Sequence, residues 1–353
     1  MSITFIGRSF DIREQWGPQE NKLIDVFKTK IDTKFPNDKN LIINLTWFGP
    51  KFGQSWQQVQ SLITNNKTFN RIFWLSLVDP ICILPTHFQE IETGVGAEYI
   101  YYIGGFDDSD YSFNFSSIPV KEDFIQYADD EILLTDLQQL FLCYNRKPKP
   151  HRIELVEKIY KNNLEIHGIV TLGKNDVSYD VSRGLKTDLY LTVDENKEDY
   201  SYNGKFLTHR DFGGIPYDLC SLGRLDIWQT CFLNIVSETE FNPWDNLFIT
   251  EKTWKPILGL RPFIINGQTK IYKYLQDNGF NTFNHYFNGI ELEDIKEFEV
   301  HDAIINVIKY LVTLDKKEII AMYNDMLPDL KHNRDRFFEF AKEQQHKMNN
   351  LFV

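Results

Sequence analysis

Three apolar runs in the second half of the chain each end in polar residues or glycine, and a helix is expected to begin where the second run ends. The runs, with the residues that follow them, are Phe232 to Val236 before Ser237-Glu238, Leu247 to Ile249 before Thr250-Glu251-Lys252, and Pro262 to Ile265 before Asn266-Gly267. Strands that end in this way are typical of an open α/β sheet, which binds its ligand beyond the carboxyl ends of its strands. The runs therefore predict such a sheet, with a ligand site at the strand ends.

The polar residues at these ends suit the parts of a nucleotide sugar. A carboxylate such as Glu238 or Glu251 can accept hydrogen bonds from the paired hydroxyls of a ribose or a sugar. The helix start at Thr250, together with Lys252, can bind phosphate, because a helix N-terminus presents free N–H groups. Glu251 and Lys252 also have a simpler interpretation, a carboxylate that favours the helix dipole beside a solvated lysine. Glu238, Thr250, Glu251 and Lys252 are the predicted donor-binding residues.

The segment from Glu238 to Phe283 resembles the donor-binding region of the α-1,3-fucosyltransferase family. Members of that family have a Glu after one strand, a Thr-Glu-Lys helix start and then a strand that contains Pro, and this chain has the same order. The segment is also similar to glycosyltransferases of large tailed phages, and Asn145 to Gly173 adds a less specific likeness. The resemblance implies the GT-B type of α/β fold, in which two Rossmann-like domains face each other across a cleft.

The most basic cluster of the chain lies between a predicted strand and a predicted helix. It consists of Arg146, Lys147, Lys149, His151 and Arg152. A run of charges is most often a solvated face. A turn between a strand and a helix is, however, where a pyrophosphate is normally bound, and the resemblance places an Arg close to this point. Arg146 or Arg152 is therefore predicted to contact a phosphate.

The length of 353 residues predicts two domains, because one hydrophobic core rarely serves so long a chain. We expect an N-terminal Rossmann-like acceptor domain at 1–135 and a C-terminal Rossmann-like nucleotide-sugar domain, with terminal helices, at 136–353. In both, short apolar runs alternate with helical patterns, which predicts mainly parallel sheets. Further strands are expected at 3–6, 41–48, 71–78, 98–103, 140–144 and 166–172, and further helices at 22–27, 56–63, 151–160, 303–314, 317–326 and 334–347.

Composition and charge narrow the class of protein. The formal net charge of -12 argues against tight non-specific binding to nucleic acid, which needs Lys and Arg to neutralise phosphates. The sequence contains no run of 18 apolar residues, and its start lacks a basic region followed by an apolar block. A cytoplasmic enzyme is expected, located in the host cytoplasm if a phage encodes it.

Neither a metal site nor a disulfide is predicted. The four cysteines, Cys82, Cys143, Cys220 and Cys231, are far apart and have apolar neighbours, as reduced core residues do. The segment Asp107 to Asp110 has the Asp-x-Asp spacing of metal-dependent glycosyltransferases, but it lies in a polar loop rather than between strands. We expect no cofactor and no metal, only a nucleotide-sugar co-substrate.

The expected function is transfer of a hexosyl or pentosyl group from a nucleoside diphosphate sugar, with inversion. In such a reaction a carboxylate takes the proton of the attacking acceptor hydroxyl. This base is expected in the N-terminal domain, where Asp79 and Glu98 are candidates, with Glu90, Glu92 and His87 as further ones.

The acceptor has more than one interpretation. A glycan hydroxyl is favoured by the family resemblance. The alternative is phage-type glucosyl or arabinosyl transfer to a hydroxymethylated cytosine in DNA, reached by base flipping, with the basic cluster and the aromatic N-terminal half as contact surfaces. An alternative of another class is a sugar- or nucleotide-binding module without catalysis.

Overall fold

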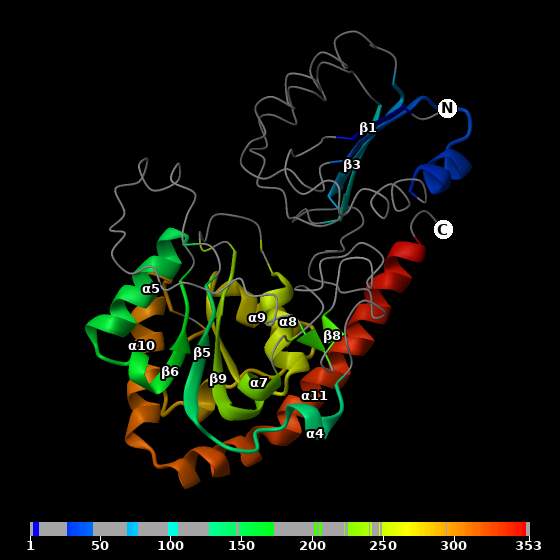
Figure 1. The fold of residues 1–353 in the computed structure, drawn as a ribbon. Helices are drawn as coiled ribbons and strands as arrows, with labels where there is room; N and C mark the ends of the chain where they lie inside the picture. The colour runs from blue at the N-terminus through cyan, green and yellow to red at the C-terminus, as the bar shows by residue number, and fades with distance from the viewer. Residues whose placement is uncertain are drawn as a thin grey trace.

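The computed structural model describes residues 3–6, 27–44, 69–76, 98–104, 127–145, 148–172, 201–202, 205–206, 222, 225–239, 241, 247, 249–293 and 295–350. These residues form a mixed α/β structure with two four-stranded parallel sheets and a short antiparallel hairpin, β7 (Ser201–Tyr202) with β8 (Lys205–Phe206) (Figure 1). The predicted α/β class and the parallel sheets are thus confirmed for this part of the chain. The division into two domains at residue 135 stays a prediction.

The first sheet consists of β1 (Ile3–Ile6), β2 (Asn40–Asn44), β3 (Arg71–Ser76) and β4 (Tyr99–Gly104), which pair in chain order. Strands that are covered on both faces are apolar throughout. This sheet follows that rule in part, since its described side chains that are fully buried are Leu41, Ile42, Ile72, Phe73 and Trp74, together with the polar Asn40. Helical residues 27–34 precede β2. The predicted helix 22–27 meets this helix only at residue 27, and residues 22–26 and the predicted helix 56–63 lie outside the described residues.

The second sheet consists of β5 (Gln139–Cys143), β6 (Gly168–Val170), β9 (Cys231–Ser237) and β10 (Phe263–Asn266). Its strand order is β10-β9-β5-β6, and all neighbours are parallel. The chain therefore moves outward from β5 to β6, returns to the other side of β5 as β9, and continues to β10. Such a reversal is a topological switch point, and it lies between β5 and β9. In open α/β sheets the ligand binds in the crevice beyond the carboxyl ends of these two strands.

Helices cover both faces of the second sheet (Figure 1). On one side α5 (Pro150–Lys161) packs against α10 (Val300–Thr313). On the other side α8 (Glu251–Leu258) packs against α11 (Lys316–Asn349). The shorter elements are α4 (Asp129–Ile132), α7 (Leu225–Thr230), α9 (Lys270–Asp277) and the 3-10 turns Glu165–His167, Asn284–Tyr286 and Glu297–Glu299.

An aromatic cluster fixes α8 against the rest of the unit. Trp254 of α8 is fully buried, and its ring centroid lies 5.6 Å from that of Phe280, 5.5 Å from Phe337 and 6.0 Å from Phe340. Phe337 and Phe340 belong to α11. Aromatic pairs at such distances add to the stabilisation from burial alone. The helix that begins at the end of the β9 loop is therefore anchored by a segment far along the chain.

Two of the predicted elements differ from the structure. Leu247 and Ile249 do not lie in a strand, because β9 is already paired on both edges by β5 and β10, and Ile249 is buried instead as a loop residue before α8. The two helices predicted at 317–326 and 334–347 are one helix, α11, with Pro328 inside it. The buried Leu330 and the hydrogen bonds between Asn333 and the backbone of Asn281 hold the helix together beyond the proline.

The described cysteines are buried free thiols. Burial raises the pKa of Cys143 to about 11 and that of Cys231 to about 11. The prediction of reduced core cysteines is confirmed for these two, while Cys82 and Cys220 lie outside the described residues. Among the described helices, not one has the length and apolar character that a bilayer crossing requires.

Candidate anion site at the switch point

Two helices begin at the switch point, beyond the carboxyl ends of β5 and β9, where the general rule for such sheets expects a ligand crevice. The chain that leaves β5 starts α5 at Pro150, with Lys149 as its N-cap, and the chain that leaves β9 starts α8 at Glu251, with Thr250 as its N-cap. A helix N-terminus carries unsatisfied N–H groups and the positive end of the helix dipole. Both helices therefore contribute positive potential at this crevice.

Two lysine side chains converge there on Thr239, the second residue after β9. Lys149 Nζ donates to the main-chain oxygen of Thr239 at 2.5 Å, and Lys252 Nζ lies 3.4 Å from Thr239 Oγ1. Lys149 comes from the β5 side of the switch point and Lys252 from the β9 side. Two cations held at one residue, between two helix N-termini, make this a candidate site for an anion, with the carboxylate of Glu251 beside Lys252.

Glu251 is the partly exposed carboxylate of the site. Its side chain is 21% exposed, and its Oε1 accepts from Lys252 Nζ at 2.7 Å. Burial raises the pKa of Glu251, but the charges of Lys252 and Lys255 outweigh this effect and leave the pKa below its ordinary value. Glu251 is therefore ionised at neutral pH and can accept hydrogen bonds from ligand hydroxyls.

Glu238 has different surroundings from those expected for a ligand-binding group. It is fully buried, and its carboxylate accepts hydrogen bonds from Thr239, Thr250 and Thr253. The Glu238 oxygens are thus surrounded by protein donors. The geometry does not favour the direct contact with hydroxyls that the sequence predicts for this residue.

Arg152 is buried beside the end of β9 rather than exposed at the surface. It is 3% exposed, and its Nη2 donates to the main-chain oxygens of Ser237 at 3.0 Å and Glu238 at 2.8 Å. Its guanidinium holds the end of β9 beside α5. The contact of Arg152 with a phosphate stays a prediction, and Arg146 lies outside the described residues.

A stack of three rings lies between α5 and α10, beside the ends of β9 and β10. The ring centroid of Phe241 lies 5.2 Å from that of His151 and 5.1 Å from that of His301. His151 Nε2 donates to the main-chain oxygen of Glu238 at 3.0 Å, and His301 Nε2 donates to Asn266 Oδ1 at 3.0 Å. The stack therefore ties the ends of β9 and β10 to α5 and α10.

Replacing His151 with Gln is expected to make the protein more resistant to acid. Burial, followed by the charge of Arg152, lowers the pKa of His151 from 6.5 to about 3. As the pH falls below 6.5 the unfolded chain takes up a proton here that the folded chain does not, so stability present above that pH is lost. The Gln side chain can still donate to Glu238 but does not titrate. Denaturant unfolding at pH 7 and pH 5 should show about 2 kcal/mol less loss for the variant; an equal loss would mean that His151 does not drive the effect.

Within the described residues, the structure places none of the proposed catalytic bases at this site. Asp79, Glu90, Glu92 and His87 lie outside them. Glu98 is exposed and directly precedes β4, so it lies at the amino end of its strand. Because ligands bind at the carboxyl ends of parallel strands, this position does not favour Glu98 as the proton acceptor.

No group of three His, Cys, Asp or Glu side chains is arranged to hold a metal ion within the described part of the chain. The segment Asp107 to Asp110 lies outside that part. Metal independence therefore stays a prediction.

The anion site includes one residue that the sequence interpretation did not select. Within the basic cluster the sequence predicts Arg146 or Arg152, and not Lys149, as the phosphate contact. The available signal was Pro150, because Pro is favoured at the first helical position and so marks Lys149 as the N-cap. A side chain at an N-cap lies at the mouth of the strand-to-helix turn, where a phosphate binds.

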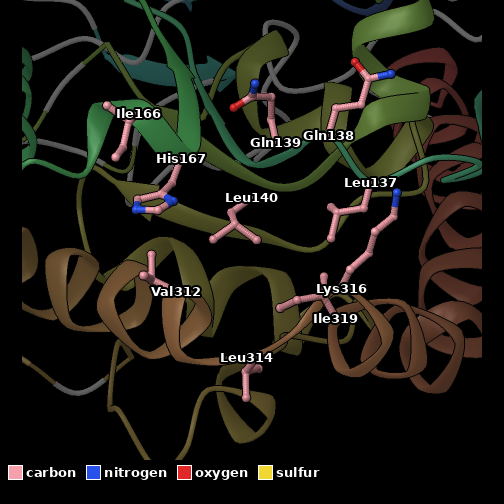
Figure 2. Close-up of a pocket in the computed structure, with 10 residues that line it drawn as sticks. All are labelled: Leu137, Gln138, Gln139, Leu140, Ile166, His167, Val312, Leu314, Lys316 and Ile319. Carbon is pink, nitrogen blue, oxygen red and sulfur yellow. The ribbon is translucent and has the colours of Figure 1, made fainter.

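A separate cavity of about 250 Å³ lies at the opposite end of the second sheet (Figure 2). It is bordered by Gln139 at the start of β5, by His167 just before β6, and by Leu314 and Ile319 on either side of the start of α11. This cavity is at the amino ends of the strands. It is therefore distinct from the switch-point crevice.

Comparison with known proteins gives one distant likeness. No protein-family model matches the sequence, and no curated protein matches it. The crystal structure of an α1,3-fucosyltransferase is similar with a TM-score of 0.38 and 16% sequence identity, over 89% of this chain and 92% of that chain. A likeness at this level decides neither the fold nor the function of this chain. The function has to follow from the geometry of the site.

Proposed function

We propose that the protein is a nucleotide-sugar-dependent glycosyltransferase of the GT-B type that inverts the anomeric centre without a metal. The observation that carries the proposal is the convergence of Lys149 and Lys252 on Thr239, between two helix N-termini at the switch point. A diphosphate has the charge and the size for such a site. The match of the Thr250-Glu251-Lys252 segment to the fucosyltransferase pattern supports the same ligand.

The site residues have distinct roles in this proposal. Lys149 and Lys252 bind the diphosphate, with Arg146 or Arg152 as a further phosphate contact. Glu251 accepts hydrogen bonds from the ribose diol of the donor. Thr250 caps α8, since its Oγ1 accepts from the main-chain N–H of Lys252 at 3.4 Å.

Transfer then proceeds as a single displacement. The acceptor hydroxyl attacks the anomeric carbon, a carboxylate takes its proton, and the bond from the sugar to the diphosphate breaks. The charge that develops on the leaving diphosphate is stabilised by the lysines and the helix N–H groups, which are already in place before the reaction. Asp79 stays the candidate for the base.

The acceptor is proposed as a glycan hydroxyl, on the strength of the sequence resemblance. The net charge of -12 speaks against a DNA acceptor, because DNA binding requires several phosphate contacts. A binding module without catalysis is the competing proposal from another class.

We expect a nucleoside diphosphate to bind in the presence of EDTA. The Kd should lie at about 1 µM to 1 mM, the range usual for enzyme substrates, and the corresponding monophosphate should bind more weakly because it offers less charge to the lysines. Calorimetry with GDP, UDP, ADP and CDP, each compared with its own monophosphate, makes the measurement and identifies the base.

Two outcomes would contradict the proposal. Binding that disappears with EDTA and returns with manganese would point to a metal-dependent mechanism and to Asp107 to Asp110. The second outcome is binding of the nucleotide sugar without its hydrolysis and without transfer of the sugar to oligosaccharides or to hydroxymethylcytosine DNA, as measured by mass analysis. That outcome would leave only the binding module.

A further inference from the structure

The carboxylate of Glu238 has a symmetrical set of donors. Oε1 accepts from Thr250 N at 3.0 Å and from Thr253 Oγ1 at 2.5 Å. Oε2 accepts from Thr239 N at 3.0 Å and from Thr250 Oγ1 at 2.7 Å. Each oxygen thus meets one backbone N–H and one threonine hydroxyl. The arrangement joins the residue after β9 to the first turn of α8.

These donors are the same residues that support the lysines of the anion site. Lys252 Nζ lies 3.2 Å from Thr250 Oγ1 and 3.4 Å from Thr239 Oγ1. Lys149 Nζ donates to the oxygen of Thr239. Glu238 Oε2 therefore accepts hydrogen bonds from Thr239 and Thr250. Lys252 contacts both of these threonines, and Lys149 contacts Thr239.

The position of Glu238 is itself fixed by close packing. A Cβ at Gly267, just after β10, would lie 2.9 Å from the Cβ of Glu238 and 3.1 Å from the Ile265 Cγ2. Real Cβ atoms essentially never approach as closely as 2.9 Å, and a contact at 3.1 Å is unusually tight. The absence of a side chain at Gly267 is thus what allows Glu238 to reach the start of α8.

We propose that Glu238 is a positioning residue, which sets the distance between Thr239 and Thr250 so that Lys149 and Lys252 act together on one diphosphate. The inference rests on the proposed function. It replaces the role of ligand contact for Glu238 with an action through Lys252.

The test is Glu238→Gln, which keeps the size of the side chain. In either orientation of the amide, its NH₂ group faces a backbone N–H, that of Thr250 or that of Thr239, and a backbone donor cannot turn to accept. The loop and the helix start must separate. We expect the Kd for a nucleoside diphosphate and for inorganic pyrophosphate to rise about tenfold or more, and the KM for the donor to rise while the KM for the acceptor stays unchanged.

A double-mutant cycle with Lys252→Ala distinguishes positioning from general stability. If Glu238 acts through Lys252, Glu238→Gln in the Lys252→Ala background should weaken binding by less than about threefold. A role that is only structural would give the full tenfold loss in both backgrounds.

Gly267→Ala is the second variant, since it displaces Glu238 without altering its charge or its donors. It should reproduce the rise in Kd if Glu238→Gln does not fold.

The results separate the two proposals. A parent protein that binds neither nucleoside diphosphate nor pyrophosphate overturns the proposed function together with this inference. Binding by the parent, with equal Kd values for a folded Glu238→Gln or Gly267→Ala variant, overturns the inference alone. Full additivity in the cycle does the same.

Discussion

Replacing both Lys149 and Lys252 with alanine should weaken the binding of a nucleoside diphosphate by at least about a hundredfold. A hydrogen bond to a charged group contributes about 1.5 to 3 kcal/mol, so each single substitution should weaken binding about 10- to 150-fold. The loss for the pair should be about 10² to 10⁴-fold if the two lysines contact different phosphate oxygens.

Glu251→Ala should reduce transfer more than tenfold, because it removes the acceptor for the ribose diol.

The control for these variants is Lys273→Ala. Lys273 on α9 carries the same charge, and its side chain is 77% exposed in a surface pair with Asp277. Its loss should leave both binding and the melting temperature close to those of the parent. An equal loss of binding in the control would mean that the electrostatic potential of all the charges of the protein, rather than contacts at this site, attracts the nucleotide. Unfolding of the Lys149 or Lys252 variant would show that these residues are structural.

Arg261→Met should have the largest effect on stability. Arg261 is 1% exposed, and burial lowers its pKa to about 10, so it stays charged at neutral pH. Its guanidinium donates to the main-chain oxygens of Cys231 at 2.8 Å and Leu260 at 2.8 Å, to Gly259 and Trp228, and to the hydroxyl of Tyr323 at 3.0 Å. It therefore joins the end of α8, the start of β9 and α11.

Removal of this guanidinium leaves several buried carbonyl groups without a donor. Each such group costs about 1 to 3 kcal/mol, so the free energy of unfolding should fall by about 4 kcal/mol or more. Denaturant titration followed by circular dichroism gives the value. Arg336→Met is the matched control, because the guanidinium of Arg336 donates to one main-chain oxygen, that of Asn278, and otherwise pairs with the exposed Glu343, so its loss should shift the midpoint less. A similar midpoint for both variants would contradict the structural role of Arg261.

The elements of the second sheet could be predicted well because their signals are local. Runs of apolar residues closed by polar ones located β5, β9 and β10, and the Thr250 to Lys252 segment located the start of α8. The false strand at Leu247 to Ile249 has the same local signal. Only the pairing of β9 with both neighbours excludes it, and pairing is not visible in a short window of sequence.

The surroundings of the predicted site residues could not be read from the sequence for a related reason. Glu238 looks like a ligand-binding carboxylate until Thr250 and Thr253, which follow 12 and 15 residues later, are seen to donate to it. Likewise, Lys149 and Arg152 are equivalent as charges in the sequence. Only the order of the strands, which places α5 against the end of β9, shows that one faces Thr239 and the other lies beneath Glu238.

The anchoring of α8 by α11 has a consequence for synthesis on the ribosome. Protein units generally fold in the order in which they are translated, yet Trp254 finds Phe337 and Phe340 only after the ribosome has passed the intervening segments. The strands of the second sheet can all emerge while the helix that begins at the anion site still lacks its support. A nascent chain without α11 therefore has the residues at the ends of β5 and β9 but lacks the packing of Trp254 on Phe337 and Phe340, so the final alignment of α8 has to wait until translation has passed α11.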